Sequence, residues 1–488
     1  MRAVSPSIGY LILFVYGIFM VLITYFFARW KGWKTIEGFL VAERRASWWL
    51  NGPSIAASWI WAGALFVSIQ MAYEKGLSGI FWFTFPNIIA LAIFAVLGRQ
   101  IRRKFDAGYT LPEYVHHTLQ SNRVHKLFLM PFFFGQLVAV TFNAFAGGVI
   151  VSFLTGIPLT IIMPILIFIT LVYTLISGLE ASIVTDFVQL VLIVLGVIVI
   201  VPWAVVSAGG LSAVRAGLHG TRGTLNIFDP AIAFSFGLVS SIGLISQTIT
   251  DQQYWQRVFA SKKEDISKAF LFGAFLFGLV PIGLSFLGFL AANPKLGIIL
   301  PAGTDPALIG ILTVNHLIRV SVAVIYTIIM LSGLTSTIDS AMSATSSLWV
   351  TDAMRYFKKQ RSKDEDCPSA DTANHRVIRQ SRFAMAGIAL FGLVCAYISY
   401  FVAGFGIKQL FLISISVAAS TSVPTVLSLY WKRLDERGVF WGILTALTIG
   451  MPLFIYANYL NKEALVALAS LFMIATSTSF CFLMPKRA

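Results

Sequence analysis

A run of hydroxyl-bearing residues at the end of one long apolar segment has the chemistry of an ion site. Nine of the twenty residues in 333–352 are Ser or Thr, although the segment is apolar from about position 320. Ser336, Ser340, Ser343 and Ser347 recur at the spacing of one helix face. Hydroxyls gain nothing from facing lipid, so we expect this face to contact protein or a water-filled path. Two interpretations follow: helix packing, which favours Ser and Thr, or oxygen ligands for a hard monovalent cation.

The elements that must position these hydroxyls are membrane-spanning helices. The 488 residues are 57% hydrophobic and only 12% charged, with a mean hydropathy of +0.82. Soluble chains carry roughly 25% charged residues, so the sequence predicts an all-α polytopic membrane protein. We expect about 13 transmembrane helices, at 8–28, 50–74, 78–98, 125–153, 157–177, 181–208, 231–250, 267–292, 318–352, 380–403, 407–431, 438–459 and 463–484.

The distribution of basic residues predicts the orientation in the membrane. Most of the 36 Lys and Arg residues fall in alternate connections between the expected spans. This asymmetry favours a multi-pass plasma (inner) membrane protein with the N-terminus outside and the C-terminus in the cytoplasm. The net charge of +15 is thus a consequence of topology and does not indicate nucleic-acid binding.

The second and seventh expected spans contain residues that interrupt helices. Residues 51–63 include Gly, Pro, Ser and two Trp, and 234–253 include Gly, Ser, Thr and Gln. Broken helices that enter from opposite faces, five spans apart, are typical of an inverted-repeat transporter. The prediction is a single transporter domain, 1–488, with spans 2–6 and 7–11 as a five-plus-five repeat. Its parts would be a peripheral span 8–28, a first repeat 50–208, a second repeat 231–431, and peripheral spans within 438–484.

The sequence lacks the features that an enzyme or a sensor would need. No His lies in the middle of an expected span and no Cys pairs with a His, so a membrane-embedded enzyme has no nucleophile with a base. The same absence predicts no cofactor and no metal other than Na+. A transporter-like sensor or receptor is a further alternative, but no expected connection is long enough to fold as a signalling domain. The expected partners are the lipid bilayer and a small-molecule solute, with no obligatory protein partner evident.

Four blocks, in order along the chain, resemble the sodium/solute symporter family. Residues 178–189 are similar to its G-L-x-A-x-x-x-T-D-x-x-Q signature, and 251–257 to its D-Q-x-x-x-Q-R block. Residues 336–340 resemble S-T-x-D-S, and 110–114 match T-L-P-E-Y. The resemblance covers roughly residues 8–431 and implies the inverted-repeat fold of the leucine-transporter type.

The resemblance also implies a sodium site between the second and ninth spans. Carried over by position, the ligands would be the backbone carbonyls of Ala57, Ile60 and Gly333 and the hydroxyls of Ser336 and Thr337. Asp186 corresponds to an acid that the family places near the cytoplasmic ion exit.

The acidic residues bear on whether the coupling ion is Na+ or H+. A site of neutral oxygens suits Na+, whereas a proton needs a titratable group. We place Asp186, Asp251 and Asp339 near helix ends or the cytoplasmic mouth, which favours Na+ and leaves H+ coupling as the alternative. Asp186 would either line the ion exit or cap the sixth helix, and Asp251 would pair with Arg257.

The candidate solute-binding residues lie near the expected break. Trp59 and Trp61 offer flat walls or a cation–π surface for a small solute, although packing alone is an equal alternative. Asn87 and Gln247 are further candidates. They belong to a set of amides that suit a small planar solute: Gln70, Asn87, Gln136, Asn143 and Gln247. Sugar-transporting relatives carry an aromatic residue at the position of Gln247, so this departure argues against a sugar. Residues 57–62, 73–79 and 251–257 most resemble the urea-transporting branch.

Overall fold

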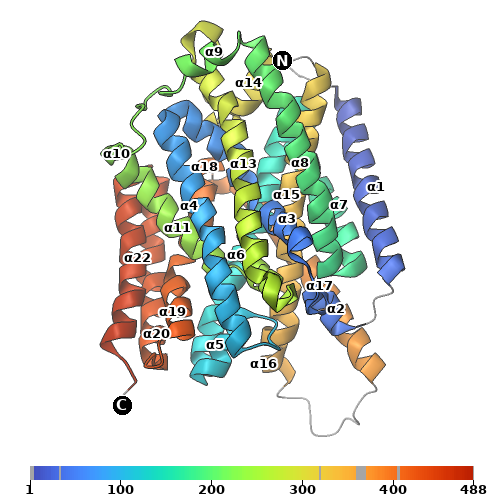
Figure 1. Ribbon diagram of the computed structural model, residues 1–488, viewed down its shortest axis with the longest axis vertical. Coiled ribbons are helices and arrows are strands. Elements are labelled where there is room, and N and C mark those ends of the chain that lie inside the picture. The colour runs from blue at the N-terminus through green and yellow to red at the C-terminus, as the bar shows by residue number, and fades with distance from the viewer. Residues whose placement is uncertain (1–4, 32–34, 318–319, 359–369, 404–406, 487–488) are drawn as a thin grey trace.

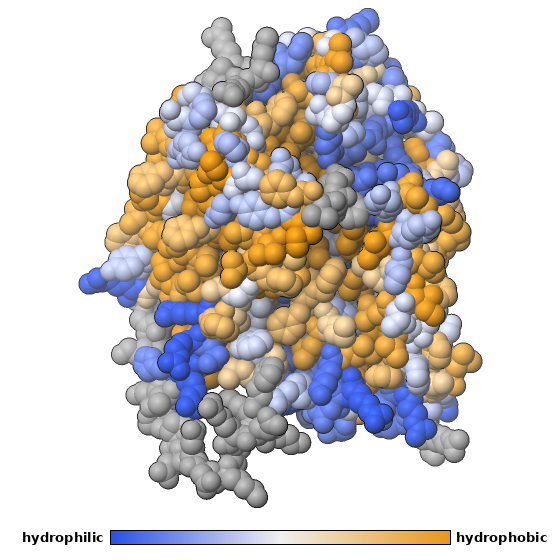
Figure 2. Space-filling model, turned by 180° about the vertical axis from the view of Figure 1, so that it is seen from behind, coloured by the Kyte–Doolittle hydropathy of each residue, from blue (hydrophilic) through white to orange (hydrophobic). Residues whose placement is uncertain are grey.

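The apolar segments form long helices whose exposed surface suits a membrane. The computed structural model describes residues 5–31, 35–317, 320–358, 370–403 and 407–486, and this part of the chain contains helices and no β-strand. Hydrophobic side chains cover the middle of the molecule and hydrophilic ones gather toward both ends (Figure 2). Helices satisfy their own backbone hydrogen bonds, which is why they can cross lipid. The predicted all-α membrane class is confirmed.

The helices run mostly along one axis, and the two termini lie at opposite ends of the molecule (Figure 1). We call the end with the N-terminus the upper end and the other the lower end. The α-helices are α1 (Pro6–Lys31), α2 (Ile36–Val41), α3 (Trp48–Trp59), α4 (Ser68–Lys104), α5 (Leu111–Leu119), α6 (Asn122–Thr155), α7 (Leu159–Ser177), α8 (Leu179–Ser207), α9 (Leu211–Ala216), α10 (Pro230–Ile232), α11 (Leu238–Thr250), α12 (Gln252–Ala260), α13 (Ile266–Ala292), α14 (Ile309–Leu317), α15 (Val320–Leu348), α16 (Met354–Lys358), α17 (Ala370–Ile398), α18 (Ile407–Ser416), α19 (Ala419–Tyr430), α20 (Glu436–Thr445), α21 (Met451–Tyr459) and α22 (Glu463–Leu483).

Short segments of other helix types join or extend these helices. The π-helical turns are Gly63–Val67, Ala233–Gly237, Trp349–Ala353, Ser399–Ala403 and Ala446–Gly450. The 3-10 turns are Ala42–Arg44, Lys263–Asp265, Pro294–Leu296 and Pro306–Leu308.

The expected thirteen spans correspond to fewer continuous helices. Among the described residues, 12 helices are long and apolar enough to cross a membrane. The expected second and third spans share one helical stretch, Gly63–Lys104, whose backbone leaves helical geometry at Gly76. The count of thirteen is therefore not confirmed.

The centre of the bundle is the helix that carries Ser336, Ser340, Ser343 and Ser347, which we call the hydroxyl stripe. In the span Val324–Tyr356, 83% of the apolar window is buried, against 28% in Pro6–Trp30 and in Asn374–Phe401. A span with so little lipid-facing surface can carry polar side chains along its length, because neighbouring helices hydrogen-bond them. The polar residues of α15 thus meet α3, α8 and α12 instead of lipid.

The second span is broken where the sequence predicts, but the seventh is not. Helix α3 ends at Trp59, Ile60 adopts φ −86° and ψ 68°, and helical structure resumes at Ala62. In the seventh span the backbone stays helical from Pro230 to Thr250, with only a π-helical turn near its upper end. The expected break inside this span is wrong, because a continuous helix accommodates its small and polar residues. The Ser241 and Thr248 hydroxyls, for example, bond carbonyls of their own helix.

Substituting Gly76 by Ala tests the departure from helical geometry between the expected second and third spans. Gly76 has φ +63° and ψ −144°, and an added Cβ would lie 2.4 Å from the carbonyl oxygen of Leu218. We expect Gly76→Ala to lower the free energy of unfolding by about 1–3 kcal/mol, measured by thermal unfolding in detergent. Gly135→Ala, in α6 with nothing within 4 Å of its added Cβ, is the control and should be neutral. Equal melting temperatures for both variants would contradict the prediction.

Candidate functional site

The hydroxyl stripe of α15 faces the short helix α12. Ser347 accepts a hydrogen bond from Gln252 Nε2 (3.2 Å) and Ser343 one from Gln256 Nε2 (3.3 Å). Ser340 accepts one from Arg257 Nη2 (2.8 Å). The stripe is therefore packed against protein, as expected, and the block 251–257 supplies its partners.

A buried ion pair lies at the end of this contact. Arg257 Nη2 is 2.7 Å from Asp186 Oδ2, and both side chains are 0% exposed. Ser54 donates to the same carboxylate oxygen at 2.6 Å and accepts from Arg257 Nε at 2.9 Å. Ser336 donates to Asp186 Oδ1. The pair and its hydroxyl partners join α3, α8, α12 and α15 in one network.

Asp251 does not form the expected pair with Arg257. Its Oδ1 accepts from the Gln253 N–H (2.9 Å), so Asp251 caps α12, and also from Gln136 Nε2 (2.9 Å). Burial raises the pKa of Asp251 to about 6. The capping role proposed for Asp186 is wrong as well, since Asp186 lies two turns inside α8.

Asp339 is a second buried carboxylate close to the ion pair. Its oxygens accept hydrogen bonds from Ser182 and from Thr185 (3.3 Å), and it is 0% exposed. Among the described residues, no basic side chain forms an ion pair with it. The network therefore holds two carboxylates and one guanidinium.

The residues expected to hold Na+ meet at the break in the second span. Gly333 packs so closely that an added Cβ would lie 2.7 Å from the carbonyl oxygen of Ile60. Thr337 Oγ1 contacts the carbonyl oxygens of Ser58 (3.3 Å) and Gly333 (3.2 Å). The Ala57 carbonyl lies in the last turn before the break and accepts from the Ile60 N–H at 3.1 Å. The Ser336 hydroxyl, unlike that of Thr337, does not bond a backbone carbonyl at the break and donates to Asp186.

The two tryptophans come together because the chain unwinds between them. Their ring centroids are 5.8 Å apart, and both side chains are almost fully buried. Trp59 contacts Tyr254 edge-on at 5.3 Å, whereas Trp61 contacts Phe142 and Phe411, each at 5.4 Å. Both Nε1 atoms are buried without a hydrogen-bond partner. We call Trp59, Trp61, Tyr254 and Phe411 the ring cluster.

The two candidate amides lie on different helices. Asn87 of α4 donates to the Phe83 carbonyl (2.7 Å), and Phe83 in turn contacts Phe411 (6.0 Å between centroids). Gln247 lies one turn before Asp251 on α11 and is half-buried. The side-chain carbonyl oxygen of each amide is buried without a partner.

Asn143 of α6, predicted only as one of several amides that suit a small solute, supports the break. Its Oδ1 accepts from the Ala62 N–H at 2.9 Å, where helical structure resumes. The only signal in the sequence is an amide inside an apolar span, which by itself does not identify the partner.

The sequence prediction also missed a polar cluster at the lower end, because it identified no functional histidine. His125 Nε2 is 2.7 Å from Asp352 Oδ1, with both side chains 0% exposed. Thr110 donates to the other carboxylate oxygen at 2.7 Å and caps α5. The T-L-P-E-Y block and the lower end of α6 are therefore both fixed to Asp352, in the segment after α15. Asp352 and His125 are 227 positions apart, so only the fold reveals the pair.

Residues 39–446 match the sodium:solute symporter family. The chain belongs to this family. It is 24% identical to the urea-proton symporter DUR3 of Oryza sativa subsp. japonica, over 92% of this chain and 66% of that protein. It is 25% identical to sodium/glucose cotransporter 1 of Oryctolagus cuniculus, over 86% of this chain and 67% of that protein. The chain thus spans about two thirds of the length of these relatives.

Solved structures of transporters share the fold of this symporter-family chain. A substrate-bound, outward-open Na+-coupled sialic acid symporter matches with a TM-score of 0.77 at 18% identity, over 99% of both chains. MhsT in complex with L-phenylalanine matches with a TM-score of 0.55 at 12% identity, over 90% of this chain and 98% of that one. The leucine-transporter-type fold is confirmed, and the matched proteins are transporters and not enzymes.

Removing the cation of the buried ion pair tests how much the pair stabilises the fold. In Arg257→Met, the Asp186 carboxylate loses its cation inside the bundle, which costs about 3–5 kcal/mol for a buried pair. We expect a large fall in melting temperature in detergent. The double variant Asp186→Asn with Arg257→Met leaves no unpaired charge and should recover part of the loss. A double variant as unstable as the sum of the two single variants would rule out the coupling.

Proposed function

We propose that this protein is a secondary active symporter that couples inward Na+ flux to the uptake of a small organic solute by alternating access. The observation that carries the proposal is the break at Ile60, where the backbone carbonyls of Ser58 and Ile60 meet Thr337 and Gly333 beside the ring cluster. Unwound backbone is tolerated in a membrane only where it is buried or binds something. Its setting would be the plasma (inner) membrane, with the upper end outside.

The sodium ligands in this proposal are Ala57, Ile60, Gly333, Ser336 and Thr337. Carbonyl and hydroxyl oxygens from two helices suit a hard monovalent cation, which replaces its water shell with such dipoles. Ser336 takes part while it donates to Asp186, because a hydroxyl that donates its proton still has lone pairs to offer. Asp186 would form the lower wall of the ion path.

The solute in this proposal is small, neutral and of the amide type, with urea as the first example to test. The indole N–H groups of Trp59 and Trp61 are donors without partners, and the Asn87 side-chain carbonyl is an acceptor without a partner. Such groups favour a solute with both a carbonyl and N–H groups, since a buried polar group left unpaired costs about 1–3 kcal/mol. Gln247 supplies a further acceptor. The resemblance to the urea-proton symporter of rice supports this class.

Coupling to H+ instead of Na+ is the second candidate. Two observations favour it: Asp339 is buried with hydroxyl partners only, and burial raises the pKa of Asp251 to about 6. If Asp251 carried the coupled proton, uptake would rise as the pH on its side falls through about 6. Asp251→Asn keeps the cap of α12 but cannot titrate, so it would abolish uptake driven by a pH gradient.

The deciding experiment is uptake into proteoliposomes with labelled urea, acetamide, an amino acid, a sugar and a carboxylate. Each solute is tested with a Na+ gradient, with a pH gradient and with neither. We expect Na+-driven accumulation of the amide-type solutes. Uptake driven only by the pH gradient would refute Na+ coupling, and accumulation of none of these solutes would refute the solute class.

Thr337→Val tests the sodium ligands with little change of shape. We expect the Na+ concentration for half-maximal uptake to rise about 3- to 10-fold, because one oxygen ligand is lost. Thr345→Val is the matched control, since that buried hydroxyl bonds Ala341 of its own helix at 2.8 Å. An unchanged Na+ dependence in Thr337→Val, with normal folding, would exclude this threonine as a ligand.

A further inference from the structure

An apolar groove runs between α1 and α7 on the outer side of the bundle, away from the candidate sodium and solute sites. It has a volume of about 960 Å³ and is lined by residues within 7–22 and 165–172. The two helices touch along its floor, where an added Cβ on Gly17 would lie 3.2 Å from Ile169 Cγ1. Phe14 and Phe168 line it while 65% and 66% exposed. In a membrane such a groove faces hydrocarbon, so it suits a lipid acyl chain.

The groove continues into a smaller pocket at the lower end of the same two helices. The groove residues of α1 lie mainly on one helix face that reaches Leu22, and Arg29, two turns further on, continues that face into the pocket. On α7, Val172 lines the groove and Ile176, one turn further on, lines the pocket. The pocket has a volume of about 290 Å³. The two cavities therefore follow one path along α1 and α7.

The smaller pocket has the charge of an anion site. Arg29 of α1 and Arg382 of α17 line it, and its described lining includes no Asp or Glu. Arg29 Nη1 donates to the Tyr25 hydroxyl (3.1 Å), and Arg382 Nη2 donates to the Ile176 carbonyl (3.4 Å). A guanidinium has five N–H donors in a planar fork that matches phosphate oxygens, so each arginine can also bind a phosphate. We call this cavity the basic pocket.

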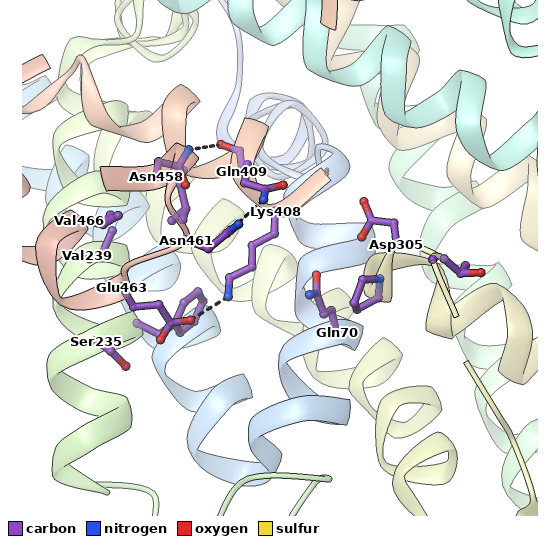
Figure 3. A pocket seen from close by; sticks show the side chains of 15 residues that line it. Gln70, Ser235, Val239, Asp305, Lys408, Gln409, Asn458, Asn461, Glu463 and Val466 are labelled. Carbon is purple, nitrogen blue, oxygen red and sulfur yellow. Dashed lines mark hydrogen bonds and ion pairs between the residues drawn. The ribbon is translucent and has the colours of Figure 1, made fainter. Parts of the chain in front are cut away.

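The upper-end pocket between α4, α11, α18 and α22 differs in charge (Figure 3). Its described lining contains the carboxylates of Asp305 and Glu463 beside the Lys408 ammonium, which pairs with Glu463 at 2.9 Å. Such a lining does not favour an anion. The preference for an anion is therefore specific to the basic pocket.

We propose that the groove and the basic pocket together bind one anionic phospholipid, with an acyl chain between α1 and α7 and the phosphate held by Arg29 and Arg382. Residues 7–22 of α1 rise about 22 Å, and one leaflet of a bilayer has a hydrocarbon depth of about 15 Å, so the groove is long enough for the chain. With the orientation proposed above, the basic pocket faces the cytoplasmic leaflet, whose lipids carry negative charge.

The charge also favours a lipid over a second copy of this chain. A copy that packed through the same groove would bring its own α1, which has the basic residues Arg29 and Lys31 and no acidic residue. That helix cannot neutralise the basic pocket, whereas the phosphate of a lipid can.

Quenching of a fluorophore in the groove tests the site without relying on transport. Ile18 lines the groove and Phe275 lies on α13 outside it, and both are exposed. Ile18→Cys and Phe275→Cys are labelled with bimane and reconstituted in phosphatidylcholine vesicles that contain a small fraction of brominated phosphatidylglycerol or brominated phosphatidylcholine. The wild-type protein reports any labelling of natural cysteines. We expect the anionic lipid to quench Ile18→Cys about threefold more than the neutral one, and both to quench Phe275→Cys equally.

Substitution of the arginines separates the basic pocket from general attraction to a basic surface. In the Ile18→Cys background, Arg29→Gln with Arg382→Gln should abolish the preference for the anionic lipid. The matched control, Arg433→Gln with Arg437→Gln, removes two exposed charges at the lower end near α20, across the molecule from α1, and should keep it (Figure 1). All four side chains are exposed, so unchanged melting temperatures should confirm that the variants fold.

Three outcomes would overturn the site. The first is equal quenching of Ile18→Cys by the two lipids, and the second is a preference that survives the loss of Arg29 and Arg382. The third is quenching by neither lipid, which would show that protein fills the groove, as in a dimer packed through α1.

Discussion

The lower half of the bundle depends on the buried ion pair between Asp186 and Arg257. Two charges removed from water are tolerated only when their geometry is close and their remaining donors and acceptors are satisfied. Ser54, Ser336 and Ser340 supply those hydrogen bonds from the helices on either side. The pair therefore fixes the position of α12 against α3, α8 and α15, and with it the partners of the hydroxyl stripe.

The break at Ile60 follows from a different constraint. A helix that stops inside a membrane leaves backbone groups unpaired, and neighbouring helices must take them up. Asn143 accepts the Ala62 N–H on one side of the break, and Thr337 reaches the Ser58 carbonyl on the other. The same unwinding lets Trp59 and Trp61 meet, because side chains two positions apart on a regular helix point to different faces. One local departure from helical geometry thus creates both the carbonyl-rich corner and the aromatic wall.

Composition and local chemistry were enough to predict much of this architecture. Apolar runs predicted the spanning helices, the Gly-Pro-Ser-Trp content of 51–63 predicted the break, and the serine spacing predicted a protein-facing stripe. Contacts between distant residues were not predictable in the same way. Arg257 pairs with Asp186 and not with nearby Asp251, because the fold places the Asp186 carboxylate of α8 within reach of the Arg257 guanidinium. His125 and Asp352 illustrate the same limit. Ser241 and Thr248 of the seventh span bond carbonyls of their own helix, which the polar composition alone did not reveal.

Ser336 connects the buried ion pair with the break at Ile60. Its hydroxyl donates to Asp186, which strengthens the oxygen as a ligand, and on the proposed assignment that oxygen also contacts Na+. On this assignment, a bound cation would attract the Asp186 carboxylate and compete with Arg257 for it. A weaker attraction to Arg257 would loosen the packing of α12 against the stripe, and departure of the ion would restore it. One bound cation would thus affect the packing at the lower end, which alternating access requires.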